Sequence, residues 1–409
     1  MKIIFVGTKN FSFFSKSILN DFEKIIITNK SYKINDELEK ASTVIRVSEV
    51  YDVNSKTLKL DYQECIEKLS EIVQNAKLYR VFCNQESNLE VAEKIRSFFS
   101  IYDHMGGRVE LFRDKLLMKQ AVIDNGLRAP VYTELAHSST PASYTDLYSK
   151  LKGKFIIKPS NSVGSRGVYK IFNSNDYDDF LKDTANDDCQ FEAEEFISGE
   201  LYEFDSALQN GEILYSNVSK YSCPMADLQE GKTLGSIMIE REQPIHQRIT
   251  QFGIKCLKAL KASDGCFHME LFHNDNDELV FLEVAARSPG LMTVPAYHCW
   301  EGVNMYDIEL YIQSGLPASD LIVHDANRVS YPSFFIVYPK ISGTVSKINT
   351  PNIDANIDID WSVHPGQVVT DTTTNIDYAA RFFVTCKNVE SANSIFNFLV
   401  NEYKAVNYD

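Results

Sequence analysis

The first hundred residues alternate between the hydrophobic patterns of strands and of helices. Short apolar runs that are typical of buried strands occupy residues 2–8, 24–30 and 78–85. Residues 62–76 and 87–100 instead carry their apolar side chains at helical spacing. Strands that alternate with helices favour a parallel sheet covered by helices. We therefore predict an open parallel α/β sheet domain in this part of the chain.

A helix and a hairpin follow this first part. The sequence RDKLLMKQAVIDNGLRAP predicts a helix that begins near Arg113 and ends at Asn125-Gly126. We expect its apolar positions to be Leu116, Leu117, Ala121, Val122 and Ile123. The sequence KFIIKPSNSVGSRGVYKI, at residues 154–171, then has two strand-like arms around a polar, glycine-bearing tip. This pattern is typical of a β-hairpin.

Two strands further along the chain each carry a glutamate in an apolar setting. Side chains alternate across a strand, so Glu270 shares a face with His268 and Phe272. On the second strand we expect an apolar face of Val280, Leu282, Val284 and Ala286 and an opposite face of Phe281, Glu283, Ala285 and Arg287. If the strands pair through their short connection, Glu270 and Glu283 lie side by side. Adjacent carboxylates favour a cation such as Mg²⁺. The alternative is a solvated sheet edge with Arg287 as a surface partner.

The hairpin tip indicates a close approach to an anion. Lys158 ends the first arm, and Gly164 and Gly167 stand in the tip. Backbone N–H groups of such a loop can fold over phosphates, and a lysine adds a point charge. The tip is not a P-loop, because no GK[ST] occurs and a strand follows, and it lacks the dinucleotide fingerprint. An ordinary surface hairpin is the alternative.

Composition narrows the function classes. The formal net charge of −15 argues against a general nucleic-acid binder. No apolar run approaches the roughly 18 residues that cross a bilayer, and the start of the chain is typical of a strand, not of a signal peptide. The eight cysteines form no CxxC pair. We expect a cytoplasmic protein with reduced thiols and no membrane association.

The order of these motifs resembles the ATP-grasp superfamily. Lys115 lies at a helix start, Lys158 precedes the glycine loop, and the extended segment EAEEFI follows it. The segments HMELF and FLEVAARSPG then supply Glu270 and Glu283, with Arg287 beyond them. The resemblance covers residues from about 80 to about 315 and extends more weakly to both ends.

This resemblance implies an architecture and a set of nucleotide-binding residues. The fold would be α/β (α+β), with an N-terminal open parallel sheet domain at residues 1–112, a central nucleotide clamp at 113–320 whose lid hairpin spans about 150–190, and a C-terminal mixed α/β subdomain at 321–409. The residues implied for the phosphates of ATP are Lys115, Lys158, Ser160, Ser162, Gly164, Ser165 and Gly167. Those implied for the adenine hinge are Glu194, Glu195, Phe196 and Ile197.

The resemblance also implies a metal site and a catalytic residue. Glu270 and Glu283 would hold Mg²⁺, with two ions expected and Mn²⁺ as a substitute. Arg287 would hold the transferring phosphoryl group or the acyl phosphate. The family often has Asn two residues after the second metal glutamate, where this chain has Ala285. One metal ligand is therefore missing or replaced.

The segment EVAARSPG is similar to the subgroup of L-amino-acid ligases. The resemblance implies an ATP-dependent ligase that joins a carboxylate and an amine, expected to be amino acids, through an acyl phosphate. The product would be an amide or dipeptide, with release of ADP and phosphate. One alternative is a ligase for another carboxylate or nucleophile, and a second is a non-catalytic nucleotide-binding protein. A homodimer is one arrangement that stays open.

Two further polar residues lie near these motifs. Glu86 follows a strand end, where open α/β sheets place ligands, and it is a secondary candidate for substrate contact. His268 shares a face with Glu270, and we expect it to be a hydrogen-bonded structural residue rather than a base.

Overall fold

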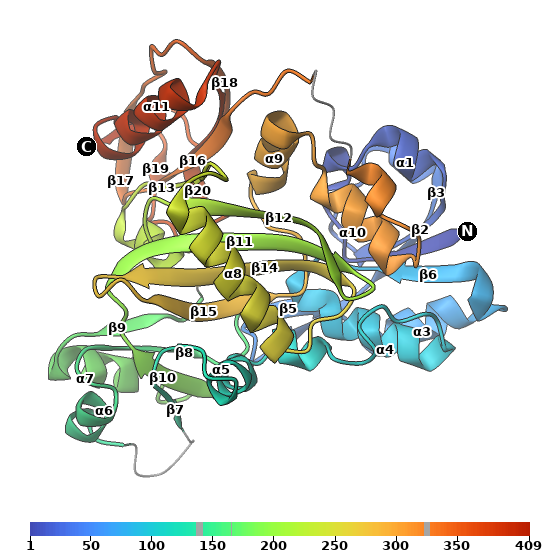
Figure 1. The fold of residues 1–409 in the computed structure, drawn as a ribbon, viewed down its shortest axis with the longest axis horizontal. Coiled ribbons are helices and arrows are strands. Elements are labelled where there is room, and N and C mark those ends of the chain that lie inside the picture. The colour runs from blue at the N-terminus through green and yellow to red at the C-terminus, as the bar shows by residue number, and fades with distance from the viewer. Residues whose placement is uncertain (136–141, 165, 323–327) are drawn as a thin grey trace.

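An open parallel sheet begins the chain, as the alternation of strands and helices predicts (Figure 1). The structure is a computed structural model that describes residues 1–135, 142–164, 166–322 and 328–409. The strands of this sheet, in spatial order, are β3 Ser42–Val47, β2 Glu23–Asn29, β1 Lys2–Val6 and β6 Tyr79–Phe82. The helices of this part are α1 Lys16–Asn20, α2 Asp36–Lys40, α3 Tyr62–Ser70 and α4 Leu89–Phe99.

The chain order of this sheet reverses between β1 and β6. Strand β1 pairs with β2 on one side, and β6 pairs with its other side. Open α/β sheets bind ligands beyond the carboxyl ends of their strands at such a point. Glu86, which begins the 3-10 helix Glu86–Asn88, lies just beyond the carboxyl end of β6.

A β-hairpin joins the N-terminal part to the sheet that follows. It consists of β4 Glu49–Asp52 and β5 Thr57–Leu60. Lys56 at its tip pairs with Asp187 at 2.6 Å, and its ammonium lies 5.0 Å from the centre of the Phe191 ring. This hairpin is not among the elements predicted from the sequence.

A four-stranded antiparallel sheet, called the lid sheet below, contains the predicted hairpin. Its strands, in spatial order, are β7 Tyr132–Leu135, β10 Phe191–Glu195, β8 Phe155–Pro159 and β9 Tyr169–Ile171. The helices α6 Tyr144–Lys150 and α7 Ser174–Asp183 accompany it. Ile157 on β8 lies opposite Tyr169 on β9, which confirms the hairpin.

The predicted helix is α5, Lys115–Asp124, and two of its apolar positions are exposed to solvent. Leu117 and Ile123 are 39% and 40% exposed, whereas Lys115 and Lys119 are buried. The buried lysines pair with carboxylates of neighbouring strands. Ion pairing with tertiary partners therefore decides which face of this helix is buried.

An eight-stranded antiparallel sheet forms the centre of the molecule. Its strands, in spatial order, are β15 Leu279–Ala285, β14 Gly265–Asn274, β11 Gly199–Gln209, β12 Glu212–Tyr221, β13 Leu234–Met238, β16 Ser333–Pro339, β20 Tyr378–Thr385 and β18 Asn356–Trp361. Helix α8 Pro244–Ala259 crosses one face of this sheet, and α9 Thr293–Glu301 and α10 Met305–Gln313 follow β15 in the chain (Figure 1).

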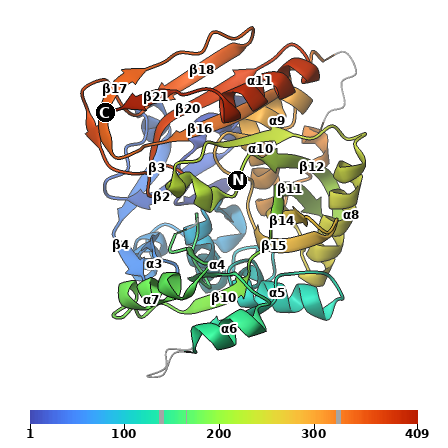
Figure 2. The ribbon, with the colours of Figure 1, turned by 90° about the vertical axis from the view of Figure 1, so that its left-hand side faces the viewer.

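The end of the chain continues this sheet and adds a small one. Strand β16 pairs with β13, so the C-terminal strands extend the central sheet. The remaining elements are β17 Gly343–Ile348, β19 Val368–Val369, β21 Val406–Tyr408 and α11 Val389–Asn401. Figure 2 shows these elements and the lid sheet at opposite ends of the molecule. Within the described ranges, we find no helix that combines the length and apolar character needed to cross a membrane.

The predicted alternation of side chains along β15 is wrong before Glu283. Leu271 of β14 lies opposite Phe281, so Leu282 is an extra residue in the ladder. This bulge reverses the two faces of the strand at that point. Phe281 consequently packs in the core with Val284, while Leu282 lines the same cavity as Glu283.

Candidate functional site

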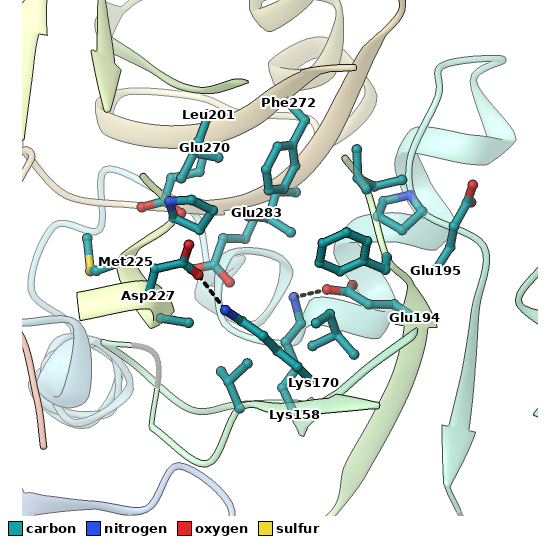
Figure 3. Close-up of a pocket in the computed structure, with 18 of the residues that line it drawn as sticks. Lys158, Lys170, Glu194, Glu195, Leu201, Met225, Asp227, Glu270, Phe272 and Glu283 are labelled. Carbon is teal, nitrogen blue, oxygen red and sulfur yellow. Dashed lines mark hydrogen bonds and ion pairs between the residues drawn. The ribbon is translucent and has the colours of Figure 1, made fainter. Parts of the chain in front are cut away.

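A cavity of about 450 Å³ lies between the lid sheet and the central sheet (Figure 3). Its charged lining residues are Lys115, Lys158, Lys170, Lys232, Glu194, Glu195, Asp227, Glu230, Glu270 and Glu283. Its apolar walls include Ile156, Val168, Phe172, Ile197, Leu201, Met225, Phe272 and Leu282. A cavity with apolar walls and converging charges suits a ligand with a flat apolar part and a charged part.

Most of the site residues predicted from the sequence line this one cavity. They are Lys115, Lys158, Ser162, Gly164, Glu194, Glu195, Phe196, Ile197, Glu270 and Glu283. The lining does not include Ser160, Gly167 or Arg287 among the described residues. Ser165 lies outside the described residues.

Ser160 and Gly167 support the loop between β8 and β9 and do not face the cavity. The backbone N–H of Ser160 donates to the carbonyl of Gln190 at 3.0 Å, and its hydroxyl donates to the same oxygen at 3.3 Å. Gly167 has a φ of +69°, and a Cβ there would lie 3.1 Å from Pro159 Cγ. The loop therefore packs against the end of β8 at Gly167, and neither residue belongs to the cavity lining. Glu195 lines the cavity, but its carboxylate accepts two hydrogen bonds of 2.8 Å from Arg128 outside it.

Glu270 and Glu283 meet across the paired strands β14 and β15, as the sequence predicts. Glu283 Oε2 lies 3.4 Å from the Lys115 ammonium. Burial disfavours the ionised Glu283 carboxylate, but Lys115 and Lys158 outweigh burial and lower its pKa. The site therefore keeps an anionic oxygen donor at neutral pH, and oxygen donors are the ligands that Mg²⁺ takes.

Four charged side chains form a buried cluster in and behind the cavity wall, which we call the Lys–Glu quartet: Lys158 and Glu194, which line the cavity, and Lys119 and Glu192 behind them. Lys158 lies 2.5 Å from Glu194 (Figure 3) and 3.8 Å from Glu192. Lys119 lies 2.6 Å from Glu192 and 2.5 Å from Glu194. Burial alone would lower the pKa of Lys158, but the two glutamates raise it. Neither Lys119 nor Glu192 is among the site residues that the sequence predicts.

Arg287 lies beyond Glu270 and Glu283 in the chain and is held by the N-terminal part of the chain. Its Nε and Nη2 donate to Glu86 Oε2 at 3.1 and 2.8 Å, and its Nη1 donates to the Ser288 carbonyl at 2.9 Å. Glu86 Oε1 accepts a further hydrogen bond of 2.7 Å from Arg113. Arg113 also donates to the backbone carbonyl of Asn161 at 2.8 Å, in the loop after β8. Glu86 thus joins the strand that carries Glu283 to the loop beside the cavity.

Residues 151–295 match the family model described as "ATP-grasp domain". The chain contains an ATP-grasp domain. This match confirms the resemblance and the fold class predicted from the sequence.

Relatives of the ATP-grasp domain include named ligases. The L-arginine-specific L-amino acid ligase of Bacillus subtilis is 25% identical over 229 residues, 54% of this chain and 54% of that protein. A D-alanine–D-alanine ligase of Oceanobacillus iheyensis is 27% identical over 222 residues, 51% of this chain and 56% of that protein. The chain thus spans about half the length of the curated relatives it matches.

A solved structure shares the fold over the whole chain. The L-amino acid ligase from Bacillus licheniformis aligns with a TM-score of 0.72 at 16% identity, covering 100% of this chain and 98% of that one. At this identity the likeness establishes the fold, and it includes the N-terminal sheet and the C-terminal strands.

A buried polar network lies behind Glu270 in the ATP-grasp domain. Side-chain oxygen and nitrogen atoms of Glu203, Asp205 and His268 lie within 4.8 Å of one another. Glu203 accepts hydrogen bonds from Tyr221, at 3.0 Å, and from Ser236. Asp205 accepts one from Tyr297 at 2.6 Å and lies 2.7 Å from His268 Nδ1. His268 Nε2 lies 3.6 Å from Glu270 Oε1. His268 therefore supports a predicted metal ligand from behind, in keeping with its expected structural role.

A charged clasp crosses the cavity from the lid sheet. Lys170 on β9 pairs with Asp227 at 2.6 Å (Figure 3) and with Glu230 at 2.6 Å. Both carboxylates belong to the 3-10 helix Met225–Glu230, which precedes β13 of the central sheet. Lys232 pairs with the other oxygen of Asp227 at 2.7 Å. These ion pairs tie the lid sheet to the central sheet across the ligand space.

Proposed function

We propose that this protein is an ATP- and Mg²⁺-dependent ligase that joins a carboxylate to an amine through an acyl phosphate and releases ADP and phosphate. One observation carries the proposal: Glu270, Glu283, Lys115 and Lys158 converge in one cavity of an ATP-grasp domain. Lysines and paired carboxylates in one cavity suit a triphosphate with its metal.

The cavity offers separate places for the base and the phosphates. The backbone of residues 194–197 and the apolar walls would receive the adenine ring, because a flat apolar base gains from burial between such side chains. Lys115 and Lys158 would bind phosphate oxygens at the end of the cavity where Glu283 lies. Ser162 and Gly164, in the loop after β8, line the cavity and would cover the phosphates.

The paired carboxylates fit a divalent metal. Glu270 and Glu283 would hold Mg²⁺, with Mn²⁺ as a substitute. Water would take the coordination position that the side chain of Ala285 cannot fill. When bound, the metal would neutralise the negative charge of the phosphate oxygens. We propose two ions, as the resemblance implies.

Arg287 would stabilise the group in transfer. A guanidinium has five N–H groups, of which three donate to Glu86 and Ser288, so two remain for a ligand among the described contacts. A carboxylate oxygen of the substrate would attack the γ-phosphorus of ATP, and ADP would leave. The amine would then attack the carbonyl carbon of the acyl phosphate, whose C–O bond breaks as phosphate leaves. The clasp through Lys170 would exclude water, which would otherwise hydrolyse the acyl phosphate.

Amino acids are the substrates that we propose for both positions. Support comes from the names of the relatives, an L-arginine-specific L-amino acid ligase and a D-alanine–D-alanine ligase. The product would then be a dipeptide. The main alternative is a non-catalytic nucleotide-binding protein, which the alanine at position 285 favours because it removes a metal ligand.

The test is release of ADP and phosphate that depends on added amino acids. The purified chain is incubated with ATP, Mg²⁺ and pools of amino acids, and products are identified by mass spectrometry. Glu283→Gln, which keeps the shape of the side chain but removes its charge, is the control. Amino-acid-dependent ADP release that the control loses supports the ligase. Tight ATP binding without turnover in any pool supports the non-catalytic alternative.

A further inference from the structure

The Lys–Glu quartet contains two residues that the proposed reaction does not use. Lys119 comes from α5 and Glu192 from β10, and both side chains are fully buried. Neither lines the cavity. Lys119 lies between the two carboxylates, at 2.6 Å from Glu192 and 2.5 Å from Glu194, and its ammonium is 5.5 Å from the centre of the Tyr132 ring. Because Lys119 reaches neither solvent nor the cavity, its charge can influence the site only through the carboxylates that it pairs with.

Lys158 stands between two competing partners, the Glu194 carboxylate and the ligand space. Its ammonium pairs with Glu194 at 2.5 Å (Figure 3), and its charge also helps to lower the pKa of Glu283. Lys158 also lines the cavity, so a phosphate there competes with Glu194 for its ammonium. A buried carboxylate that loses its only cation is strongly destabilised. Glu194 has a second cation, because Lys119 holds its other oxygen.

We propose that Lys119 is a positioning residue for nucleotide binding, because it holds Glu194 in place of Lys158 and so frees Lys158 for a phosphate. This inference rests on the proposed function, since it requires a nucleoside triphosphate in the cavity. Glu192 acts in the opposite direction. It competes with Glu194 for Lys119 at 2.6 Å and attracts Lys158 from 3.8 Å.

The charges of the quartet predict effects of opposite sign for its two unassigned members. Without Lys119, both glutamates depend on Lys158, which stays where it is. Without the charge of Glu192, Lys119 pairs only with Glu194. Lys158 is then held less strongly by the quartet and moves more freely towards a phosphate. A purely structural role predicts instead that loss of either residue weakens the site.

The experiment measures equilibrium binding of ATP and of adenosine, with Mg²⁺, to the full chain. For Lys119→Met we expect the Kd of ATP to rise about tenfold or more, the scale of one buried charge contact. The Kd of adenosine, which has no phosphate, should change less than about threefold. For Glu192→Gln we expect ATP to bind as tightly as to the wild type or more tightly. An unchanged Kd of ATP in Lys119→Met, or weaker binding in Glu192→Gln, overturns the inference.

A double variant covers the case in which Lys119→Met does not fold. The pair Lys119→Met and Glu192→Gln removes one charge of each sign, so the quartet stays neutral. Lys158 then remains the sole cation of Glu194, and ATP should bind about tenfold more weakly than to the wild type. Recovery of wild-type affinity would overturn the inference. If the wild type itself does not bind ATP, the proposed function fails, which distinguishes the two failures.

Discussion

Glu86 and Arg287 are 201 positions apart in the chain, and Arg287 donates two hydrogen bonds to the Glu86 carboxylate at 3.1 and 2.8 Å. Glu86 follows the edge strand of the N-terminal sheet, and Arg287 follows a strand of the ATP-grasp domain. The N-terminal part of the chain thus fixes the orientation of the Arg287 guanidinium, which we propose stabilises the transferring phosphoryl group. Preorganised donors of this kind need no rearrangement during the reaction.

The first prediction concerns this contact. Glu86→Ala should lower kcat by roughly 10²-fold, because Arg287 loses two of its fixed hydrogen bonds. Glu86→Gln should lose less, because its amide oxygen can still accept a hydrogen bond. Steady-state release of ADP measures both. Glu90→Gln, which alters a nearby carboxylate paired with Lys59, is the control. Turnover of Glu86→Ala at the wild-type rate would show that the contact with Glu86 does not position Arg287 for the reaction.

The second prediction is a dependence of stability on pH. Burial disfavours the ionised Glu86 carboxylate, but Arg287, Arg113 and Lys115 lower its pKa from 4.5 to about 2. The unfolded chain therefore binds the proton more readily than the folded chain between these values. The stabilisation is complete above pH 4.5 and is lost as the pH falls towards 2.

Urea unfolding of the wild type and of Glu86→Gln measures this effect. Between about pH 6 and about pH 3 the wild type should lose about 2 kcal/mol of unfolding free energy more than the variant. Equal losses in both proteins would show that Glu86 is not held as an anion by its arginines.

The third prediction concerns the residues that we propose to bind the metal and the phosphoryl group. Glu283→Ala and Arg287→Ala should each lower turnover by roughly 10²-fold or more, the scale of one preorganised charge contact. Removal of Mg²⁺ with EDTA should abolish turnover, and added Mn²⁺ should restore it. ADP release by both variants at a near-normal rate would rule out this site.

The fourth prediction concerns the clasp across the cavity. Lys170→Met removes two ion pairs of 2.6 Å that tie the lid sheet to the central sheet. Bound nucleotide should dissociate about tenfold faster from the variant, a change of about 1.4 kcal/mol. Stopped-flow displacement of a fluorescent ATP analogue measures the rate. Lys182→Met is the matched control, because its ion pair with Asp179 is exposed on the surface. Dissociation from both variants at the wild-type rate would mean that the clasp does not retain the nucleotide.

The sequence by itself determined the local elements and the motif residues. Alternating apolar runs gave the parallel sheet, and the polar tip between two apolar arms gave the hairpin of β8 and β9. Glu270 and Glu283 are on neighbouring strands of one hairpin, so their pairing followed from a short connection. These features depend on neighbours in the chain, which a pattern of residues can specify.

Only the tertiary structure decided which charged groups meet across the chain. Lys119 occupies a helical position that is fully buried, and nothing in its local pattern indicates that Glu192, 73 positions away, neutralises it. The bulge at Leu282 likewise depends on the register with β14, and the contact of Glu86 with Arg287 depends on how two sheets pack. Burial of a charge is favourable only when its partner arrives, and that partner is set by the packing of distant elements rather than by sequence neighbours.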